Sequence, residues 1–307
     1  MAAPLIRIAT RQSKLALWQA NFVRAELLRL HPQLQVELVG MTTKGDRWLQ
    51  APLSEIGGKG LFIKELEAAM LAGQADIAVH SVKDLPAELP EGFALPIVAY
   101  REDVRDVLVS PAGDLAALPK GARVGSSSLR RQAQLLVQRP DLELKPIRGN
   151  VGSRLDKLAS GEYDAIVLAA AGLNRLQLDV PRYPLAIDLC LPAPGQAALG
   201  IECRVDLDAE LRALLEPLQD PDTERCVRAE RGISLGLGAD CSLPVAALAT
   251  LEQDGSLDLQ ARIARADGSQ ILHTRQRGDE PLQVAQTAVE DLFAQGAADI
   301  LASLAQD

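Results

Sequence analysis

The sequence predicts an α/β fold followed by a smaller α+β segment near the C-terminus. Three observations support this prediction. The chain opens with a strand, a helix and a second strand; short apolar runs then alternate with helical patterns; and three short strand patterns follow one another directly near the C-terminus. With 307 residues, the chain is too long for one ordinary core, so two or three domains are expected.

The opening of the chain predicts two parallel strands joined by a helix. Residues 5–9 and 34–39 have strand patterns, and residues 14–30 carry apolar side chains near helical spacing, with Ser13 as the expected N-cap. Such a unit has a right-handed crossover. Arg11 and Ser13 therefore follow the carboxyl end of a strand, which is the edge where open α/β sheets bind ligands.

A long polar stretch, residues 42–60, comes next and contains Gly57-Gly58-Lys59-Gly60. It does not match the Gly-Lys-Ser/Thr pattern of a phosphate loop. Because long loops in compact domains are often functional, we interpret the stretch as a lid that carries Lys59, with an ordinary connector as the alternative. A helix is expected over residues 61–72.

The strand expected over residues 75–79 leads into His80-Ser81-Val82-Lys83-Asp84-Leu85-Pro86. The final proline lacks an amide hydrogen and ends the extended run. Ser81, Lys83 and Asp84 therefore lie on a short loop just past a strand end, where a ligand would bind. A solvated loop with a weak ion pair is the alternative.

The middle of the chain continues the alternation. Strands are expected over residues 106–109, 142–147 and 164–169, and helices over residues 129–138 and 153–160; residues 93–99 are a further apolar segment. Two segments, residues 101–103 and 191–196, are interpreted as hinges, because the first is charged and the second is rich in proline and hostile to helix formation.

Arginine recurs where these strands end. Arg130 and Arg131 lie in the first turn of a helix, after Ser128, although cations there oppose the helix dipole. A locally unfavourable choice of this kind often marks a functional site. The full set of arginines at strand ends is Arg11, Arg130, Arg131, Arg148, Arg154 and Arg175.

The charge distribution predicts a local site for an anion. The formal net charge is −9, yet residues 120–157 contain nine Lys or Arg and three Asp or Glu. The overall acidity and the 3% aromatic content disfavour a nucleic-acid groove, and no convincing helix-turn-helix pattern is present. A small or oligomeric organic anion is favoured instead.

Composition argues against several other classes. The three histidines lack the spacing of metal ligands, so no metal site is expected. No apolar run approaches the roughly 20 residues of a membrane helix, and no secretory signal is visible. The four cysteines are widely spaced, which fits a reducing cytoplasm better than a disulfide framework.

The last part of the chain has a different pattern. A strand is expected over residues 199–203, and helices over 209–215 and 220–235. A glycine-rich loop with Cys241 follows. Strands are then expected over residues 245–251, 257–264 and 270–276, with a final helix over residues 281–304.

Six stretches taken together resemble the porphobilinogen deaminase (hydroxymethylbilane synthase) family. The combination spans the chain and is specific, although each stretch alone is a weak signal. The stretches are Ile8-Ala9-Thr10-Arg11-Gln12-Ser13, Gly57-Gly58-Lys59-Gly60-Leu61-Phe62, His80-Ser81-Val82-Lys83-Asp84, Ser127-Ser128-Leu129-Arg130-Arg131, Arg148-Gly149-Asn150-Val151-Gly152 and Gly200-Ile201-Glu202-Cys203-Arg204.

The resemblance implies two lobes like those of type II periplasmic binding proteins and a small C-terminal α+β domain with a three-stranded sheet. Residues 1–99 with 198–218 would form the first, discontinuous lobe, residues 100–197 the second lobe, and residues 219–307 the domain with the cofactor cysteine. It also implies a cytoplasmic monomer that acts on a small molecule, without a nucleic-acid or membrane partner.

The resemblance further implies a transferase of porphyrin, tetrapyrrole and heme biosynthesis. Such an enzyme joins four porphobilinogen units, with release of ammonia, onto a dipyrromethane cofactor held by a thioether link to Cys241, and water then releases linear hydroxymethylbilane. Each pyrrole brings two carboxylates, which arginine binds well because it stays charged and pairs in a bidentate manner.

The resemblance assigns roles to the residues at the strand ends. Asp84 is the expected catalytic group, which stabilises developing positive charge or moves protons. Lys59 is a possible lid residue. The expected carboxylate-binding residues are Arg11, Ser13, Ser81, Lys83, Ser128, Arg130, Arg131, Arg148, Arg154 and Arg175.

The sequence departs from the family pattern at three places, one of which is Ser126, where threonine is common. Ala239-Asp240 precedes Cys241 where Gly-Gly is usual, and an acidic neighbour disfavours the thiolate. Gly195-Gln196-Ala197 replaces the usual Gly-Gln-Gly. The alternative function is a two-lobe protein that binds a small anion without catalysis, because the fold alone does not decide between the two.

Overall fold

The computed structural model describes residues 4–42, 63–239 and 243–304. Its contacts divide the chain into two units, residues 1–101 with 198–224 and residues 102–197 with 225–307. The chain therefore changes units next to the two segments that the sequence analysis interprets as hinges. The division into three domains stays a prediction.

The first unit is built on a sheet whose described strands have the order β2-β1-β3-β10-β4. β1 is parallel to β2 and β3, whereas β10 is antiparallel to β3 and β4. The elements are β1 (Leu5–Arg11), α1 (Lys14–Leu30), β2 (Gln35–Met41), α4 (Lys64–Leu71), β3 (Ile77–Ser81), the 3₁₀ helix η1 (Val82–Asp84), β4 (Phe93–Arg101), β10 (Ala198–Arg204), α8 (Ala209–Leu215) and the 3₁₀ helix η2 (Glu216–Leu218).

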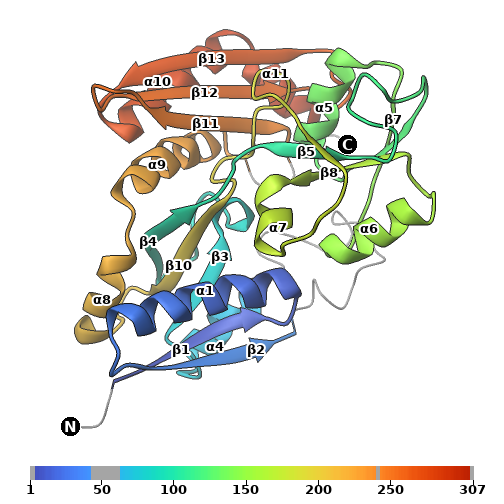
Figure 1. Cartoon of the computed structure of the whole chain (residues 1–307). Helices are drawn as coiled ribbons and strands as arrows, with labels where there is room; N and C mark the ends of the chain where they lie inside the picture. The colour runs from blue at the N-terminus through green and yellow to red at the C-terminus, as the bar shows by residue number, and fades with distance from the viewer. Residues whose placement is uncertain (1–3, 43–62, 240–242, 305–307) are drawn as a thin grey trace. The chain divides into compact units, whose positions relative to one another are not determined.

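Helices α1 and α4 cover opposite faces of this sheet (Figure 1). Alternate residues of a strand point to opposite faces, so Ile77 and Val79 of β3 pack in the core with α1, while Ala78 packs with α4. Ser13 caps α1 by accepting a hydrogen bond from the amide of Ala16 at 3.3 Å. The expected parallel pair and the helix between its strands are confirmed.

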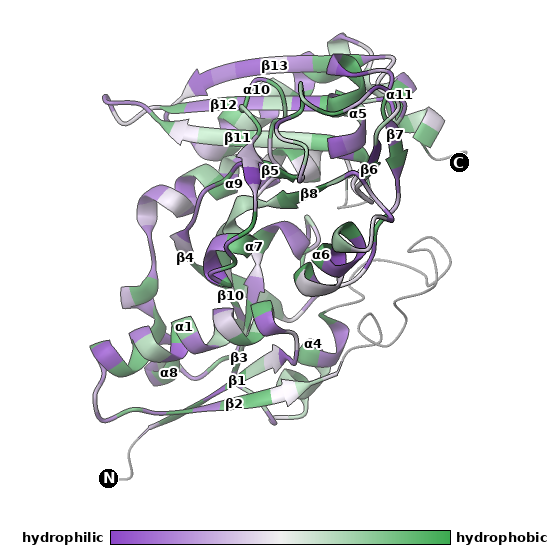
Figure 2. Ribbon diagram, turned by 45° about the vertical axis from the view of Figure 1, so that its right-hand side comes forward, coloured by the Kyte–Doolittle hydropathy of each residue, from purple (hydrophilic) through white to green (hydrophobic). Residues whose placement is uncertain are grey.

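The second unit contains a sheet whose described strands have the order β7-β6-β8-β5-β9. β6 is parallel to β7 and β8, whereas β5 is antiparallel to β8 and β9. Figure 2 shows β5 and β8 as mostly hydrophobic strands. The elements are β5 (Asp106–Val109), β6 (Arg123–Gly125), α5 (Leu129–Gln138), β7 (Glu143–Lys145), α6 (Val151–Ala159), β8 (Ala165–Ala169), α7 (Ala170–Arg175) and β9 (Arg182–Pro184).

A separate antiparallel sheet, β11-β12-β13, forms the C-terminal part of the second unit. It packs on α9, α10 and α11 around one hydrophobic core (Figure 1). The elements are α9 (Pro221–Gly236), β11 (Val245–Leu251), β12 (Leu257–Ala264), β13 (Ile271–Gly278), α10 (Pro281–Ala294) and α11 (Ala297–Leu304). The predicted α/β fold with a small three-stranded α+β part is confirmed.

Three local expectations were wrong. The single helix expected over residues 281–304 is broken between α10 and α11, where Gly296 has φ of 107° and leaves the helical region. Lys83 and Asp84 lie in the 3₁₀ helix η1 rather than on an open loop. Strand β9 was not expected, because its three residues carry no apolar alternation.

Ala197 adopts a backbone conformation that favours glycine, with φ of 71°. Its carbonyl oxygen accepts hydrogen bonds from Nη2 of Arg175 at 2.5 Å and from the amide of Glu102 at 3.2 Å. These bonds hold the residue in the left-handed region and join the two segments at which the chain changes units. The departure from Gly-Gln-Gly therefore falls at a strained residue.

Ala197→Gly is expected to raise the free energy of unfolding by about 0.5–1 kcal/mol, because relief of the left-handed strain exceeds the added entropy of the unfolded chain. Urea unfolding would measure this gain. The matched control is Ala193→Gly, whose φ is negative, and which we expect to destabilise the protein. Equal losses of stability in both variants would contradict the assignment of strain to Ala197.

Candidate active site

The first unit brings five of the expected site residues to one edge of its sheet. β1 and β3 are parallel neighbours with Ala9 opposite Ala78, so their carboxyl ends lie side by side. Arg11 is the last residue of β1, and Ser81 is the last residue of β3. Ser13 caps the helix after β1, and Lys83 and Asp84 follow β3 in η1.

Helix η1 turns its apolar side chains inward and its charged side chains outward. Val82 and Leu85 are buried, whereas Lys83 is half-buried and Asp84 is exposed. Val82 fits because Gly200 of β10 has no side chain: a Cβ there would lie 3.0 Å from Cγ2 of Val82. The 3₁₀ geometry therefore places the Asp84 carboxylate at the surface of a rigid support.

Ser81 is held from a second direction. Its hydroxyl oxygen accepts a hydrogen bond from Nε2 of Gln19, at 2.6 Å, and Gln19 is a buried residue of α1. This bond explains why the polar Gln19 lies on the buried face of α1, and it links α1 to the end of β3. Sequence reasoning missed Gln19, because it falls among the apolar positions of the helix and has no partner nearby in the chain.

The second unit places six further expected residues after strands that end at one edge of its own sheet. β6, β7 and β8 are parallel, so the segments that follow them start from one edge. The segment after β6 carries Ser128, Arg130 and Arg131; the segment after β7 carries Arg148 and Arg154; and Arg175 ends α7, which follows β8.

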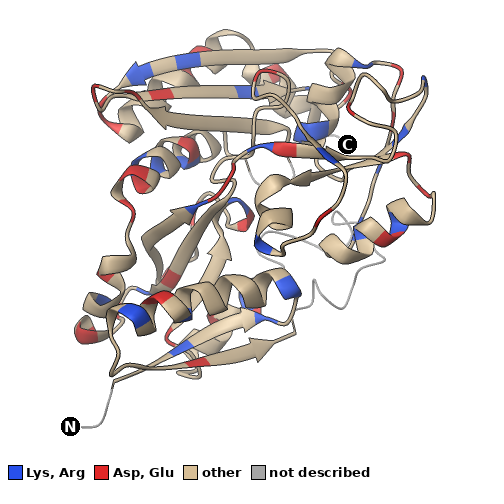
Figure 3. Ribbon diagram, viewed as in Figure 1, with Lys and Arg blue, Asp and Glu red and all other residues tan. Residues whose placement is uncertain are grey.

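Asp106 pairs with both arginines at the start of α5. Its Oδ2 lies 2.8 Å from Nη2 of Arg130, and its Oδ1 lies 2.7 Å from Nη2 of Arg131. Nε2 of Gln196 also donates to Oδ1, at 2.9 Å. Figure 3 shows the basic positions of α5 beside an acidic position of β5. The two cations that oppose the helix dipole are thus partly neutralised by the carboxylate of Asp106 on β5, and not by an acidic residue of α5 itself.

This cluster carries more positive than negative charge. Two buried guanidinium groups share one carboxylate, and Asp106 is fully buried. Burial opposes the charge of Arg130, but the attraction of Asp106 outweighs it and the pKa of Arg130 is raised. Nε of Arg131 is buried without a hydrogen-bond partner in the part of the chain that the structure describes. An anionic group would complete the cluster.

The other arginines of the second unit differ in their partners. Nε of Arg154 donates to the carbonyl oxygen of Gly149 at 2.8 Å, which folds the arginine over its own loop. Arg175 is buried and holds Ala197. Arg148 is half-buried and makes no hydrogen bond or ion pair with the residues described here, so it is the arginine best placed to take a new anion.

Ser128 is the N-cap residue of α5, but its hydroxyl makes no capping hydrogen bond. The hydroxyl therefore stays available for another acceptor. The amide of Ser128 instead donates to the hydroxyl of Ser126 at 3.2 Å. Among the described residues, the first turn of α5 thus has a hydroxyl that does not cap the helix.

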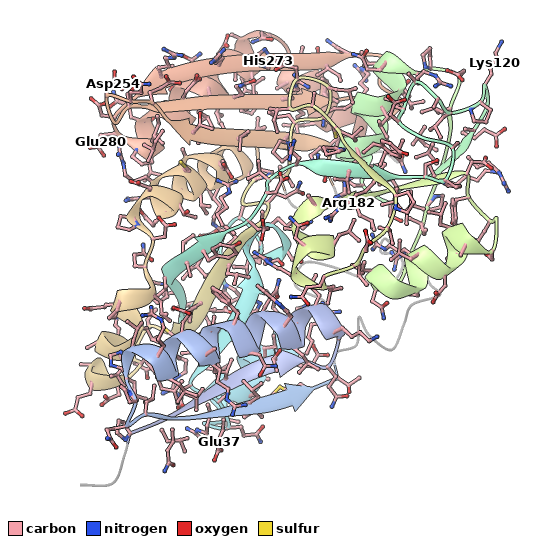
Figure 4. The ribbon with its side chains drawn as sticks, in the orientation of Figure 1. Glu37, Lys120, Arg182, Asp254, His273 and Glu280 are labelled. Atoms are coloured by element: carbon pink, nitrogen blue, oxygen red, sulfur yellow. The ribbon has the colours of Figure 1, made fainter. Side chains whose placement is uncertain are left out.

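Only some of the basic residues in the block 120–157 belong to the candidate site. Lys120 is exposed and points outward at the edge of the unit (Figure 4). Arg123 pairs with Asp164, and Arg139 pairs with Asp141. These surface pairs contribute little to stability and play no part at the sheet edge. Sequence counting alone did not separate them from the arginines that face the site.

Three of the four cysteines are buried, namely Cys190, Cys203 and Cys226. Burial raises the pKa of Cys190 to about 12, and burial also raises the pKa of Cys203. Thiolates are therefore disfavoured at both residues. Lys59 and Cys241 lie outside the described residues.

The described residues contain neither a membrane-spanning helix nor a cluster of metal ligands. No helix is long and apolar enough to cross a bilayer. No group of three or more His, Cys, Asp or Glu residues is arranged to hold a metal ion, within residues 4–42, 63–239 and 243–304.

Comparison with known proteins gives two matching family models. Residues 6–212 match the porphobilinogen deaminase dipyromethane cofactor binding domain, and residues 224–294 match the porphobilinogen deaminase C-terminal domain. Two relatives, both named porphobilinogen deaminase and both from strains of Acidithiobacillus ferrooxidans, are 52% identical to this chain over 298 residues, which covers 96% of this chain and 97% of each relative.

Solved structures give more distant likenesses. The periplasmic aliphatic sulphonate binding protein SsuA from Escherichia coli has a TM-score of 0.42 and 14% identity, over 75% of this chain and 70% of that chain. The BenM effector binding domain with benzoate has a TM-score of 0.43 and 15% identity, over 71% of this chain and 91% of that chain. Likenesses this distant have no bearing on function.

Proposed function

The chain belongs to the porphobilinogen deaminase family, and from that premise we propose which of its residues carry out the reaction. The protein is a transferase of tetrapyrrole and heme biosynthesis, a hydroxymethylbilane synthase that uses a dipyrromethane cofactor. Its substrate is the small molecule porphobilinogen. The alternative of a binding protein without catalysis is not favoured.

Asp84 is the proposed catalytic residue. Loss of ammonia from the substrate leaves a pyrrole that carries positive charge, and an exposed carboxylate on a rigid turn is suited to stabilise that charge. Arg11 and Lys83 lie at the same sheet edge and would bind substrate carboxylates, with Ser13 and Ser81 as hydroxyl donors. Charge stabilisation is proposed as the main role of Asp84, ahead of proton transfer.

The excess of buried positive charge around Asp106 is the observation that carries the proposal for the second unit. Arg130 and Arg131 share one carboxylate, and Nε of Arg131 has no partner among the described residues. A dipyrromethane with acetate and propionate arms fits this cluster, because its carboxylates would balance the charge. The proposed carboxylate-binding residues here are Ser128, Arg130, Arg131, Arg148, Arg154 and Arg175.

The dipyrromethane, when bound, supplies the carbon to which substrate is joined. Cys241 is its proposed attachment point. Support comes from the other cysteines, because Cys190, Cys203 and Cys226 are buried. Lys59 is proposed as a lid residue. A cytoplasmic monomer with three domains, and without a membrane partner, is also proposed.

Cys241→Ser is expected to remove the cofactor. The intact mass of the purified wild-type protein should exceed the mass of its chain by two pyrrole units, and the variant should lose that excess and its turnover. Cys203→Ser is the matched control and should keep the extra mass, because Cys203 is fully buried. A wild-type mass equal to that of the bare chain would contradict the proposed attachment and favour the binding protein.

A further inference from the structure

A buried histidine–glutamate pair lies next to the segment that carries Asp84. His80 belongs to β3 and Glu202 to β10, and both side chains are buried. Nε2 of His80 lies 2.7 Å from Oε2 of Glu202. The two atoms are in close contact, although the angles do not suit a hydrogen bond.

The strand register puts these two residues on one face of the sheet. β10 is antiparallel to β3, with Gly200 opposite His80 and Glu202 opposite Ala78. His80 and Glu202 are therefore diagonal neighbours, a spacing that long side chains can bridge. The face is the one covered by α4, where Ala78 packs against Leu66.

The same two strands hold the start of η1. Val82 follows His80 on the same face and packs against the bare Cα of Gly200. Two residues of β10, Gly200 and Glu202, thus hold two residues of the segment that leads to Asp84. A change at either contact would move the point at which the Asp84 carboxylate leaves the sheet.

Stability does not explain why a histidine and a glutamate are used here. A buried pair of polar side chains is often no more stabilising than apolar side chains of the same volume, because both polar groups lose their hydration. Nearby Glu67 of α4 adds to the cost: burial and the Glu202 carboxylate raise the pKa of Glu67 to about 7. What the pair does provide is a side-chain contact between β3 and β10 in addition to the backbone pairing of the two strands.

We propose that Glu202 and His80 form a positioning pair for Asp84. Glu202 holds the imidazole of His80, and this contact sets the place and direction in which η1 presents the carboxylate to the substrate. The proposal rests on the catalytic role proposed for Asp84. Because the pair would act on the orientation of the Asp84 carboxylate, loss of the pair should lower kcat while the cofactor stays bound.

The test uses the full-length enzyme with its cofactor. Glu202→Gln is expected to lower kcat by about 10- to 100-fold, because a small misplacement of a reacting group has a cost of this size. KM should change by less than about threefold, since the carboxylate-binding residues are untouched. His80→Gln should have the same effect, and the double variant should lose no more than either single variant, because each residue acts through the other.

Cys203→Ala is the matched control. Cys203 follows Glu202 on β10 and is fully buried, but its side chain packs in the core with α1, on the face of the sheet opposite to His80. Its kcat should stay within about twofold of wild type. Intact mass and thermal unfolding would be measured for every variant, and His80→Gln decides the question if Glu202→Gln does not fold.

Three results would overturn the proposal: an unchanged kcat in both single variants, losses that multiply in the double variant, or an equal loss in Cys203→Ala. The outcome for Asp84→Asn separates this proposal from the proposed function. If Asp84→Asn is inactive and Glu202→Gln is fully active, only the positioning pair is wrong. Normal turnover in Asp84→Asn would refute both.

Discussion

Asp84→Asn is expected to lower kcat by about 10²- to 10³-fold while the enzyme keeps its dipyrromethane. Asparagine has nearly the same shape and can still accept a hydrogen bond, but it lacks the charge that would stabilise a pyrrolic cation. The side chain is exposed, so the fold should not depend on it. Steady-state kinetics, intact mass and thermal unfolding would be measured on the same preparation.

The matched control for Asp84→Asn is Glu88→Gln. Glu88 is also an exposed acid, a few residues further along the same segment, and no role is proposed for it. Removal of the negative charge of Glu88 should leave kcat within about twofold of wild type. If both variants lost activity equally, the general negative charge of this surface would explain the effect, and the specific role of Asp84 would be wrong.

Local patterns predicted most of the elements. Helix α1 was predicted with its correct ends, because Ser13 and Pro32 provide start and stop signals that depend only on neighbouring residues. The break at Gly296 was missed for a related reason. The apolar spacing continues across it, and a single glycine is tolerated inside a helix, so the pattern does not show where the chain turns.

The candidate site was predicted less completely, because its supporting residues depend on strand direction. Asp106 looks like the polar first residue of an apolar strand. β5 runs antiparallel to β8, with Asp106 opposite Ala169, so the start of one strand lies at the carboxyl end of the other. Periodicity contains no information about direction. Glu202 was missed for the same reason, since its partner His80 is distant in the chain.

Asp106→Asn is expected to lower the free energy of unfolding by about 3–5 kcal/mol, the usual cost of removing one partner from a buried ion pair. Arg130 and Arg131 would keep their charges without a carboxylate between them. Urea unfolding would measure the loss. The control is Asp103→Asn, which removes a more exposed pair with Arg105 and should cost less than about 1 kcal/mol.

A second substitution tests the cause of that loss. If the cost of Asp106→Asn comes from uncompensated positive charge, then Arg131→Met in the same chain should restore part of the stability, because one buried cation is removed. If the loss of stability came only from the hydrogen bond between Gln196 and Asp106, Arg131→Met would not restore it. An additive loss in the double variant would therefore contradict the charge excess, and with it the main support for carboxylate binding at the start of α5.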